Sequence, residues 1–353
     1  MALNKILIVG LGRGTAWARE IRKDPSLEIV GLVDVDADRL AGVSAEVNVP
    51  AVCCYTDYET ALARSGADLV ILAVPTPLHK NYILRGLATG HHVICEKPLA
   101  LSLAEAHELR AAIRGFDHRF MVGEQYRFAD GVENLRRAIT GGVIGPLAYI
   151  DHAFFRGSRL IAGRWAGGEH WSQTYQEASL QDMSVHHFDM WYYMTGARPV
   201  EVSVTPFDVS WNPSVRKFGY SLTARLENGV HVTYLTARSL ARPQTPWYGT
   251  LWIVGQDGAL AWDGDSSAVS LSRVGAGTDP FVQEIKSEPL AYVDRGISGT
   301  NAPLLLMIRE LDAAIAANRR HACDLDDNVV SFATSMAAVE SARTGRPARV
   351  PLD

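Results

Sequence analysis

The chain has 353 residues, of which 47% are hydrophobic and 21% charged, proportions typical of a globular protein. This length predicts two domains, because one hydrophobic core rarely serves so many residues. The formal net charge is −5, from 34 Lys and Arg against 39 Asp and Glu, which argues against a nucleic-acid partner because such a partner needs a basic surface.

Three further features bear on where the protein works. No apolar run approaches the roughly 18 residues that a membrane-spanning helix needs, and the chain starts with a strand-like run rather than a signal peptide. The four cysteines form no CxxC pair, so neither a zinc site nor a disulfide framework is predicted. Together these features favour a cytoplasmic protein in a reducing compartment.

A glycine-rich turn follows the first strand-like run. The apolar run Lys5–Val9 is typical of a strand covered on both faces, and a helix is predicted from the turn to about Lys23. Glycines in this setting allow a tight turn and let backbone N–H groups approach a pyrophosphate at the helix N-terminus. Thr15 replaces the third glycine of GxGxxG, the one that serves helix–strand packing. The predicted cofactor-binding residues here are Gly10, Gly12, Arg13 and Gly14.

Asp34 ends the next predicted strand, Glu28–Val33, and lies 24 residues after Gly10. A carboxylate at about this separation can accept hydrogen bonds from the adenosine ribose, and it repels a 2′-phosphate. The position therefore predicts NAD as the cofactor, with NADP less favoured. The alternative is that Asp34 merely caps the helix that starts near Asp36.

Strands and helices keep alternating up to residue 125, which indicates a right-handed, doubly wound parallel sheet. Further strand-like runs lie at 51–54, 68–74, 92–95 and 120–123. Ligands of such sheets bind at the carboxyl edge of the strands. Two loops meet that edge, and from them we predict cofactor contacts by Pro75, Thr76, His79 and Glu96.

Lys97 belongs to the second of these loops, in the sequence Cys95-Glu96-Lys97-Pro98. Ser102 and Glu105 form a capping box for the helix that follows and ends near Arg114. A lysine held at the carboxyl edge of a parallel strand is a candidate for catalysis. For this fragment alone, the alternative is a plain turn with a solvated lysine.

The pattern changes after Tyr126, so we predict a first domain over 1–125 and a second over 126–353. Several alternating strand-like runs separated by turn signals predict a largely antiparallel sheet in the second domain. Two helices are predicted near the end of the chain, and the polar segment 274–301 resembles a long loop.

One predicted helix of the second domain carries an unusual polar set. Asp182, His186 and Asp189 fall at i, i+4 and i+7, on one face of the helix. Three interpretations stay open from spacing alone: a general base with an orienting acid, a pair of metal ligands, or a hydrogen-bonded network in the core. His187 is adjacent and points elsewhere.

Taken together, these motifs resemble those of the Gfo/Idh/MocA oxidoreductase family. The resemblance spans nearly the whole chain, and the order EKP then DxxxHxxD is its most specific part. It is carried by GLGRG (10–14), DLVILAVPTPLH (68–79), HHVICEKPLALS (91–102), QYRF (125–128), IGP (144–146), DxxxHxxD (182–189) and SARTGRPARV (341–350).

The resemblance implies an α/β protein, with an N-terminal Rossmann domain and a C-terminal α/β domain whose sheet is open and mostly antiparallel. It also implies catalytic roles: Lys97 hydrogen-bonds the reacting oxygen, His186 takes its proton, and Asp182 binds substrate or orients the pair. Glu96 and a cis Pro98 would fix the loop. Trp165 and Gln125 correspond to positions near the cofactor, and the predicted substrate-binding residues are Lys97, Arg127, Tyr175, Asp182, His186 and His187.

The predicted activity is NAD-dependent oxidation of a secondary hydroxyl of a sugar or cyclitol, without a metal. Two alternatives stay open: lyase or glycosidase chemistry through transient oxidation with retained NAD, and a non-catalytic NAD-binding sensor. The polar stretch 175–181 departs from the family pattern, in which paired glycines are frequent, so the substrate pocket is not the generic one. An open sheet further predicts a homodimer or homotetramer.

Overall fold

The computed structural model describes residues 3–156, 177, 179–212, 217–237, 243–275, 285–296 and 299–352. The chain forms two compact units. Unit 1 comprises Met1–Gln125 and Asn301–Val329, and unit 2 comprises Tyr126–Thr300 and Val330–Asp353. The prediction assigned all of 126–353 to the second domain, whereas Asn301–Val329 belongs to unit 1.

A helix and a loop explain why Asn301–Val329 belongs to unit 1. Helix α9 (Pro303–Ala316) packs against α1 (Leu11–Ile21) and buries apolar side chains such as Leu304 and Leu311. After α9, the carbonyl of Cys323 accepts a hydrogen bond of 3.0 Å from the N–H of Val122 at the edge of the sheet. The late segment therefore completes the core of the first unit.

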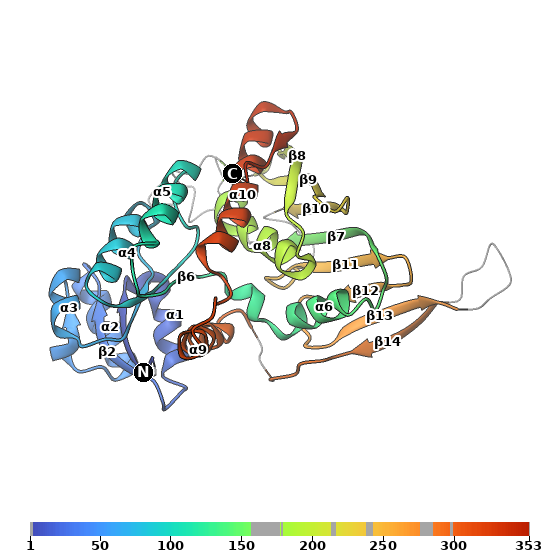
Figure 1. Cartoon of the computed structure of the whole chain (residues 1–353). Coiled ribbons are helices and arrows are strands. Elements are labelled where there is room, and N and C mark those ends of the chain that lie inside the picture. The colour runs from blue at the N-terminus through green and yellow to red at the C-terminus, as the bar shows by residue number, and fades with distance from the viewer. Residues whose placement is uncertain are drawn as a thin grey trace. The chain divides into compact units, whose positions relative to one another are not determined.

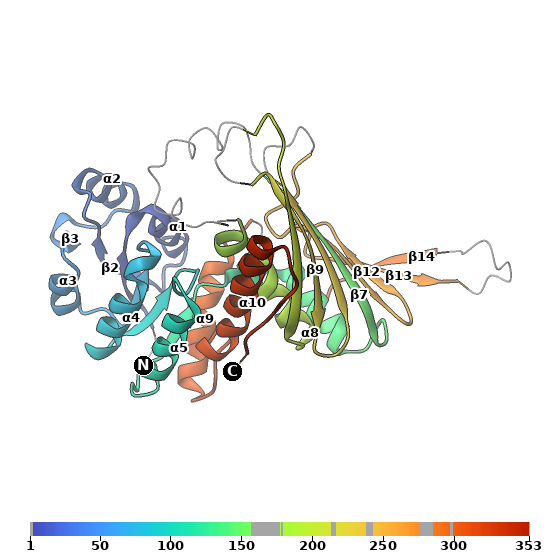
Figure 2. The ribbon, with the colours of Figure 1, turned by 90° about the horizontal axis from the view of Figure 1, so that it is seen from above.

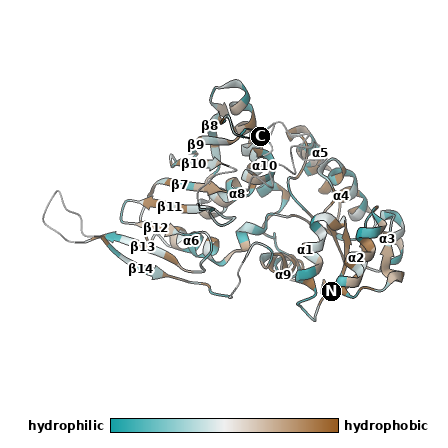
Figure 3. Ribbon diagram, turned by 180° about the vertical axis from the view of Figure 1, so that it is seen from behind, coloured by the Kyte–Doolittle hydropathy of each residue, from teal (hydrophilic) through white to brown (hydrophobic). Residues whose placement is uncertain are grey.

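Unit 1 contains a six-stranded sheet in the order β3-β2-β1-β4-β5-β6. All of its strand pairs are parallel, which confirms the predicted doubly wound sheet. Brown segments in Figure 3 mark its central, hydrophobic strands, whose side chains are almost fully buried. The strands are β1 (Lys5–Val9), β2 (Glu28–Val33), β3 (Cys54–Tyr55), β4 (Leu69–Leu72), β5 (His92–Cys95) and β6 (Phe120–Val122).

Three helices of unit 1 begin at side-chain caps that the sequence makes recognisable. Asp36, Asp57 and Ser102 each accept a hydrogen bond from the backbone N–H three residues later. Helices α1 and α2 contact each other, as do α4 and α5. The remaining helices of this unit are α2 (Ala37–Val47), α3 (Tyr58–Arg64), α4 (His79–Ala88) and α5 (Leu103–Ile113), with a short helical turn η2 (Thr76–Leu78) before α4.

Unit 2 contains a nine-stranded sheet in the order β14-β13-β12-β11-β7-β10-β9-β8-β15. Only the pair β7 and β10 is parallel among its described strand pairs, which confirms the predicted open, mostly antiparallel sheet. The strands are β7 (Leu147–Phe155), β8 (Pro199–Phe207), β9 (Gly219–Leu226), β10 (His231–Ala237), β11 (Thr250–Gly255), β12 (Ala259–Trp262), β13 (Val269–Val274), β14 (Ile285–Leu290) and β15 (Ala348–Arg349). Strand β14 lies inside the polar segment for which a loop was predicted.

One face of this sheet is covered by helices (Figures 1 and 2). Tyr234 of β10 contacts Ser184 and His187, and His152 of β7 accepts a hydrogen bond from Trp191, so α8 packs on this face. The opposite face presents large apolar side chains to solvent, among them Tyr149, Leu235 and Trp252. The helices of unit 2 are α6 (Asp130–Thr140), the π-helical turn η5 (Ser179–Met183), α8 (Ser184–Thr195) and most of α10 (Leu325–Thr344). The turn η3 (Gln125–Phe128) belongs to unit 2 from Tyr126 onward.

A buried ion pair joins three helical segments of unit 2. Arg127 of η3 donates to both carboxylate oxygens of Asp189 in α8, at 2.6 and 2.7 Å, and the two side chains are 2% and 0% exposed. The hydroxyl of Ser331 in α10 donates to the same carboxylate at 2.7 Å. Bidentate geometry and the extra donor satisfy a charge that would otherwise be costly to bury.

No helix among the described residues combines the length and the apolar character needed to cross a bilayer.

We expect Arg127→Ala to lower the free energy of unfolding by about 3–5 kcal/mol, because the substitution leaves the Asp189 carboxylate buried without its counter-charge. The matched control is Arg198→Ala, which removes an ion pair with Glu227 whose side chains are 46% and 36% exposed. That change should cost no more than about 1 kcal/mol. Urea unfolding followed by tryptophan fluorescence measures both, and equal losses would contradict the assignment.

Candidate active site

The three glycines at the junction of β1 and α1 serve different purposes: Gly10 precedes α1, and Gly12 and Gly14 lie near its start. Gly10 has φ of 85°, and a Cβ there would meet the carbonyl oxygen of Ala73 at 2.6 Å, so both backbone and space demand glycine. A Cβ on Gly14 would meet Cγ2 of Ile8 at 2.9 Å, so glycine at this position allows α1 to pack closely on β1. A Cβ on Gly12 would meet nothing within 4 Å. The packing role expected of the third glycine in the motif is therefore filled by Gly14, one position before Thr15.

Asp34 fastens the end of β2 to the start of α1. Its carboxylate accepts from the N–H of Leu11 at 2.7 Å and from the N–H of Asp36 at 2.9 Å. The guanidinium of Arg39 lies at 3.2 Å. Asp36, not Asp34, caps α2 by accepting from the N–H of Arg39, so the capping alternative for Asp34 is wrong. Arg39 offsets part of the repulsion that Asp34 would exert on a 2′-phosphate.

The loop after β4 contains a buried hydroxyl that suits a ligand. Thr76 is 1% exposed, and its Oγ1 has no hydrogen-bond partner among the described residues. A buried polar atom of this kind is costly unless something satisfies it. With the open space beside Gly12 and the N-terminus of α1, it fits a dinucleotide bound at the carboxyl edge of the sheet.

His79 connects the two loops at this edge. Its Nδ1 faces the carbonyl oxygen of Pro98 and its Nε2 faces that of Val74, each at 3.0 Å. Burial lowers the pKa of His79, although the carbonyls act in the opposite direction. The neutral ring has one N–H, so it donates to one carbonyl at a time. His79 was predicted to bind the cofactor, and these contacts instead occupy its ring within the protein.

Arg13 is the centre of a hydrogen-bonded cluster at the same edge. Its guanidinium donates to Glu96 at 3.0 Å and to Asn301 at 2.7 Å. It also donates at 3.1 Å to the amide oxygen of Gln125, whose amide nitrogen donates to the carbonyl of Gly123. Trp17 donates to the same Glu96 oxygen at 2.8 Å. Three of the predicted cofactor residues thus hold one another, and Asn301 joins them although nothing in its local sequence marks it.

Lys97 follows β5 at the carboxyl edge and is half-buried. The peptide bond between Lys97 and Pro98 is cis, as the resemblance implied. His79 contacts the carbonyl of Pro98, so this loop is tied to the neighbouring one. Pro75 precedes η2 in that neighbouring loop.

In unit 2, His186 lies at the start of α8 and is 3% exposed. The ring of Tyr126 stacks on it, with centroids 4.3 Å apart and an angle of 16° between the planes. Tyr126 was not predicted as a site residue, although it sits in the QYRF motif. Asp182 lies in the π-helical turn η5 that precedes α8, and such turns are frequent at functional sites.

His187 has a different environment from His186. Its Nδ1 lies 2.8 Å from the hydroxyl of Tyr234 and its Nε2 lies 3.0 Å from the carbonyl of Trp247, and the residue is 0% exposed. Burial lowers its pKa to about 3. Both nitrogens are thus occupied inside unit 2, so the predicted substrate contact of His187 finds no support.

The remaining predicted substrate residues divide into two groups. Arg127 is committed to the buried ion pair with Asp189, which does not support its predicted contact with substrate. Trp165 and Tyr175 lie outside the described residues. Of the stretch 175–181, the described Glu177 accepts a hydrogen bond from the hydroxyl of Tyr220. No three His, Cys, Asp or Glu side chains are grouped as metal ligands in the part of the chain that the structure describes.

The two glycines of α1 can be separated by experiment. Gly14→Ala should destabilise the protein by about 1–3 kcal/mol, because the new Cβ crowds a branched side chain of a buried strand. Gly12→Ala should leave stability unchanged or slightly raised and weaken NAD binding, because a methyl group would narrow the approach to the pyrophosphate. Thermal unfolding and a fluorescence titration with NAD measure the two effects. Normal NAD affinity in Gly12→Ala would contradict the assignment.

Two family models match most of the chain. The model described as an oxidoreductase family with an NAD-binding Rossmann fold matches residues 4–124. The model of the GFO/IDH/MocA C-terminal domain matches residues 132–261.

Named relatives and solved structures are similar to the chain at low identity. An inositol 2-dehydrogenase of Corynebacterium glutamicum is 29% identical, covering 65% of this chain and 66% of its own. A 2,7-anhydro-N-acetylneuraminate hydratase of Mediterraneibacter gnavus is 26% identical, covering 58% and 52%. The structure of a levoglucosan dehydrogenase in complex with NADH and levoglucosan superimposes with a TM-score of 0.83 at 18% identity, covering 99% of this chain and 100% of the other.

The matched ranges follow the order of the two units and contain five of the seven motifs that carry the resemblance, all except QYRF (125–128) and SARTGRPARV (341–350). The chain therefore belongs to the Gfo/Idh/MocA family of oxidoreductases and begins with its NAD-binding Rossmann domain.

Proposed function

We propose that this protein is an NAD-dependent dehydrogenase that oxidises a secondary hydroxyl of a sugar or cyclitol. The observation that carries the proposal is the retention of Lys97, Asp182 and His186 in the two most specific motifs of the family. The similarity to an inositol 2-dehydrogenase supports a polyol substrate. Bound NAD would supply the hydride acceptor.

His186 is proposed to take the proton of the reacting hydroxyl. Oxidation of an alcohol requires loss of this proton as hydride leaves carbon, and a neutral imidazole is a suitable base near pH 7. The stacked ring of Tyr126 restricts the orientation of the imidazole. Asp182, four residues earlier, is proposed to bind substrate or to orient the base.

Lys97 is proposed to hydrogen-bond the reacting oxygen. Its positive charge would stabilise the alkoxide character that develops as the proton leaves. The contact between Nδ1 of His79 and the carbonyl of Pro98 supports this role, because it restrains the loop that carries the lysine.

Asp34 supports NAD as the preferred cofactor. Its carboxylate lies 6% exposed at the end of β2, next to the N-terminus of α1. A 2′-phosphate would meet this negative charge, whereas ribose hydroxyls can donate to it.

A second candidate is lyase or hydratase chemistry with retained NAD. The similarity to 2,7-anhydro-N-acetylneuraminate hydratase favours it, as do the polar residues of the stretch 175–181. In this reaction transient oxidation acidifies a neighbouring C–H bond, a substituent leaves or water adds, and the substrate is reduced again. Net production of NADH distinguishes the two candidates.

The outer face of the nine-stranded sheet is proposed to form a homodimer or homotetramer interface. Tyr149, Leu235 and Trp252 lie on neighbouring strands and are 44%, 42% and 51% exposed. A second copy could cover this apolar face, because the same three side chains would meet across a two-fold axis.

The proposed dehydrogenase is tested by screening sugars and cyclitols with NAD, and in parallel with NADP, for reduced cofactor. With the best substrate, Lys97→Ala and His186→Ala should each lower kcat by about 10²–10⁴. The matched controls are Lys23→Ala, which changes an exposed lysine, and His107→Ala, which changes a half-buried histidine of α5.

Turnover of Lys97→Ala and His186→Ala within about tenfold of the original enzyme would show that the roles are assigned wrongly. Conversion of a substrate without accumulation of NADH would replace the dehydrogenase by the second candidate. A preference for NADP would contradict the role given to Asp34.

The oligomer is tested by light scattering of the protein and of Trp252→Glu. The unsubstituted protein should have a mass of two or four times 38.5 kDa. A charge at Trp252 should dissociate it, because burying an unpaired carboxylate is costly. Trp211→Glu is the control, since Trp211 is 61% exposed outside the sheet. A monomeric unsubstituted protein would overturn the proposal.

A further inference from the structure

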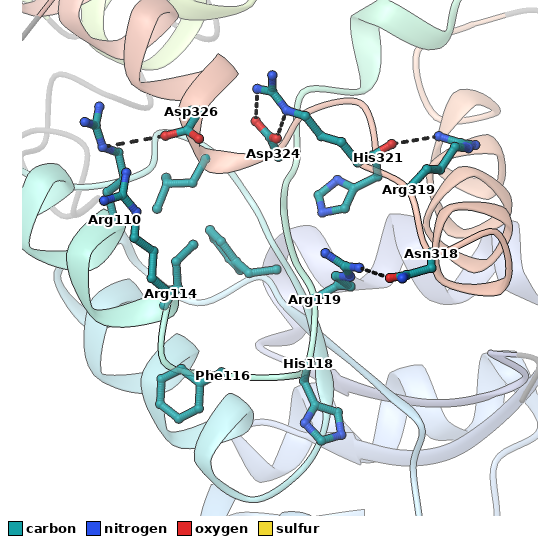
Figure 4. A pocket seen from close by; sticks show the side chains of 14 residues that line it. Arg110, Arg114, Phe116, His118, Arg119, Asn318, Arg319, His321, Asp324 and Asp326 are labelled. Atoms are coloured by element: carbon teal, nitrogen blue, oxygen red, sulfur yellow. Dashed lines mark hydrogen bonds and ion pairs between the residues drawn. The ribbon is translucent and has the colours of Figure 1, made fainter.

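An arginine-lined pocket lies within unit 1, apart from the residues considered so far. Its volume is about 360 Å³, within the size range of small-molecule sites. Three segments contribute its walls: the end of α5 with the turn after it, the start of β6, and the connection between α9 and α10 (Figure 4). Five of its lining residues are arginines, namely Arg110, Arg114, Arg119, Arg319 and Arg320.

The positive charge in this pocket exceeds the negative charge. Five arginines line it against two acidic residues, Asp324 and Asp326. Figure 4 shows the ion pair of Arg110 with Asp326. Arg320 forms an ion pair with Asp324. Arg114 is exposed, and its guanidinium makes no hydrogen bond or ion pair with another described residue. Arg319 and Arg320 also pair with Glu310 and Asp327, which lie outside the lining, so Arg114 and Arg119 are the pocket arginines that have no carboxylate partner among the described residues.

Two of the pocket arginines form hydrogen bonds that restrict the conformation of their side chains. Arg319 makes a two-pronged contact with Glu310 at 2.7 and 2.8 Å, and the same carboxylate accepts from the N–H of Ala322. Arg119 donates to the side chain of Asn318 at 3.1 Å. These contacts limit the side-chain entropy that would be lost when the guanidinium groups engage a ligand.

The pocket lies at the opposite edge of the sheet from the cofactor residues. Arg119 immediately precedes β6, whereas Gln125, which contacts Arg13, follows that strand. Strands of this sheet are parallel, so their amino ends share one edge and their carboxyl ends the other. A ligand in the pocket would thus be separate from NAD and from the reacting substrate.

We propose that this pocket binds a small phosphorylated metabolite. Guanidinium groups arriving from three segments suit a tetrahedral dianion, because each planar fork can engage phosphate oxygens from its own direction. Half-buried Ile113 and Phe116 give the remainder of the molecule an apolar wall. This inference does not depend on the proposed activity.

The test is isothermal titration calorimetry with glycerol 3-phosphate at constant ionic strength. The protein is first saturated with NAD, so that the phosphate-binding turn of the cofactor site is occupied. We expect saturable binding of one molecule for each chain. Arg114→Gln should weaken it by about tenfold or more, since it removes a charge-assisted donor whose guanidinium forms no hydrogen bond or ion pair with another described residue.

The matched control is Arg64→Gln, an exposed arginine at the end of α3 in the same unit. Arg64→Gln should change the affinity for glycerol 3-phosphate by no more than about twofold. It removes the same charge from the protein as Arg114→Gln but leaves the pocket unaltered. Circular dichroism of both variants checks that each is folded. The proposal is overturned by absent saturable binding, by equal losses in the two variants, or by an affinity that falls as the NAD concentration rises. A titration with inorganic phosphate should show weaker binding than glycerol 3-phosphate. Equal affinities would contradict the proposal that the pocket also binds the organic part of the ligand.

Discussion

The carboxyl edge of the parallel sheet depends on the buried imidazole of His79. This ring links two loops, because it lies between the carbonyls of Val74 and Pro98. One loop carries the buried hydroxyl of Thr76 and the other carries Lys97. With one N–H and two acceptors, the neutral ring leaves one carbonyl without a full donor. The loops are therefore restrained without being locked, which suits an edge that must admit and release a cofactor.

Most of unit 1 could be predicted from the sequence because its signals are local. The glycine turn, the apolar strands and the caps at Asp57 and Ser102 each lie within a few residues of the structure they determine. The partners of predicted residues were harder to find. Arg127 and Asp189 are 62 residues apart, and no spacing rule connects them. For the same reason the local sequence marks His187 as a site residue, although its ring contacts Tyr234 and Trp247.

Two other features of the structure differ from what the local sequence patterns predict. The packing glycine of α1 is Gly14 rather than the next residue, because the side chain that it must avoid belongs to Ile8 on β1. Strand β14 is polar and exposed along most of its length, so it lacks the alternation that marks a half-buried strand. It is a strand because it pairs with β13. Pairing with another strand does not by itself produce a periodic pattern of apolar residues in the sequence.

The π-helical turn Ser179–Met183 has a consequence for how this family member can change. A π turn contains one residue more than an α turn, so it represents an insertion held within a continuous helix. Because one turn closes in both helix types, deleting Met183 would restore α-helical winding and leave the chain before the turn nearly unrotated relative to α8. Within the turn, Gln181 would move toward the place of Asp182, while His186 and the Arg127–Asp189 ion pair would stay where they are. A single-codon deletion could thus exchange the residue presented beside the proposed base without disturbing the fold that holds it.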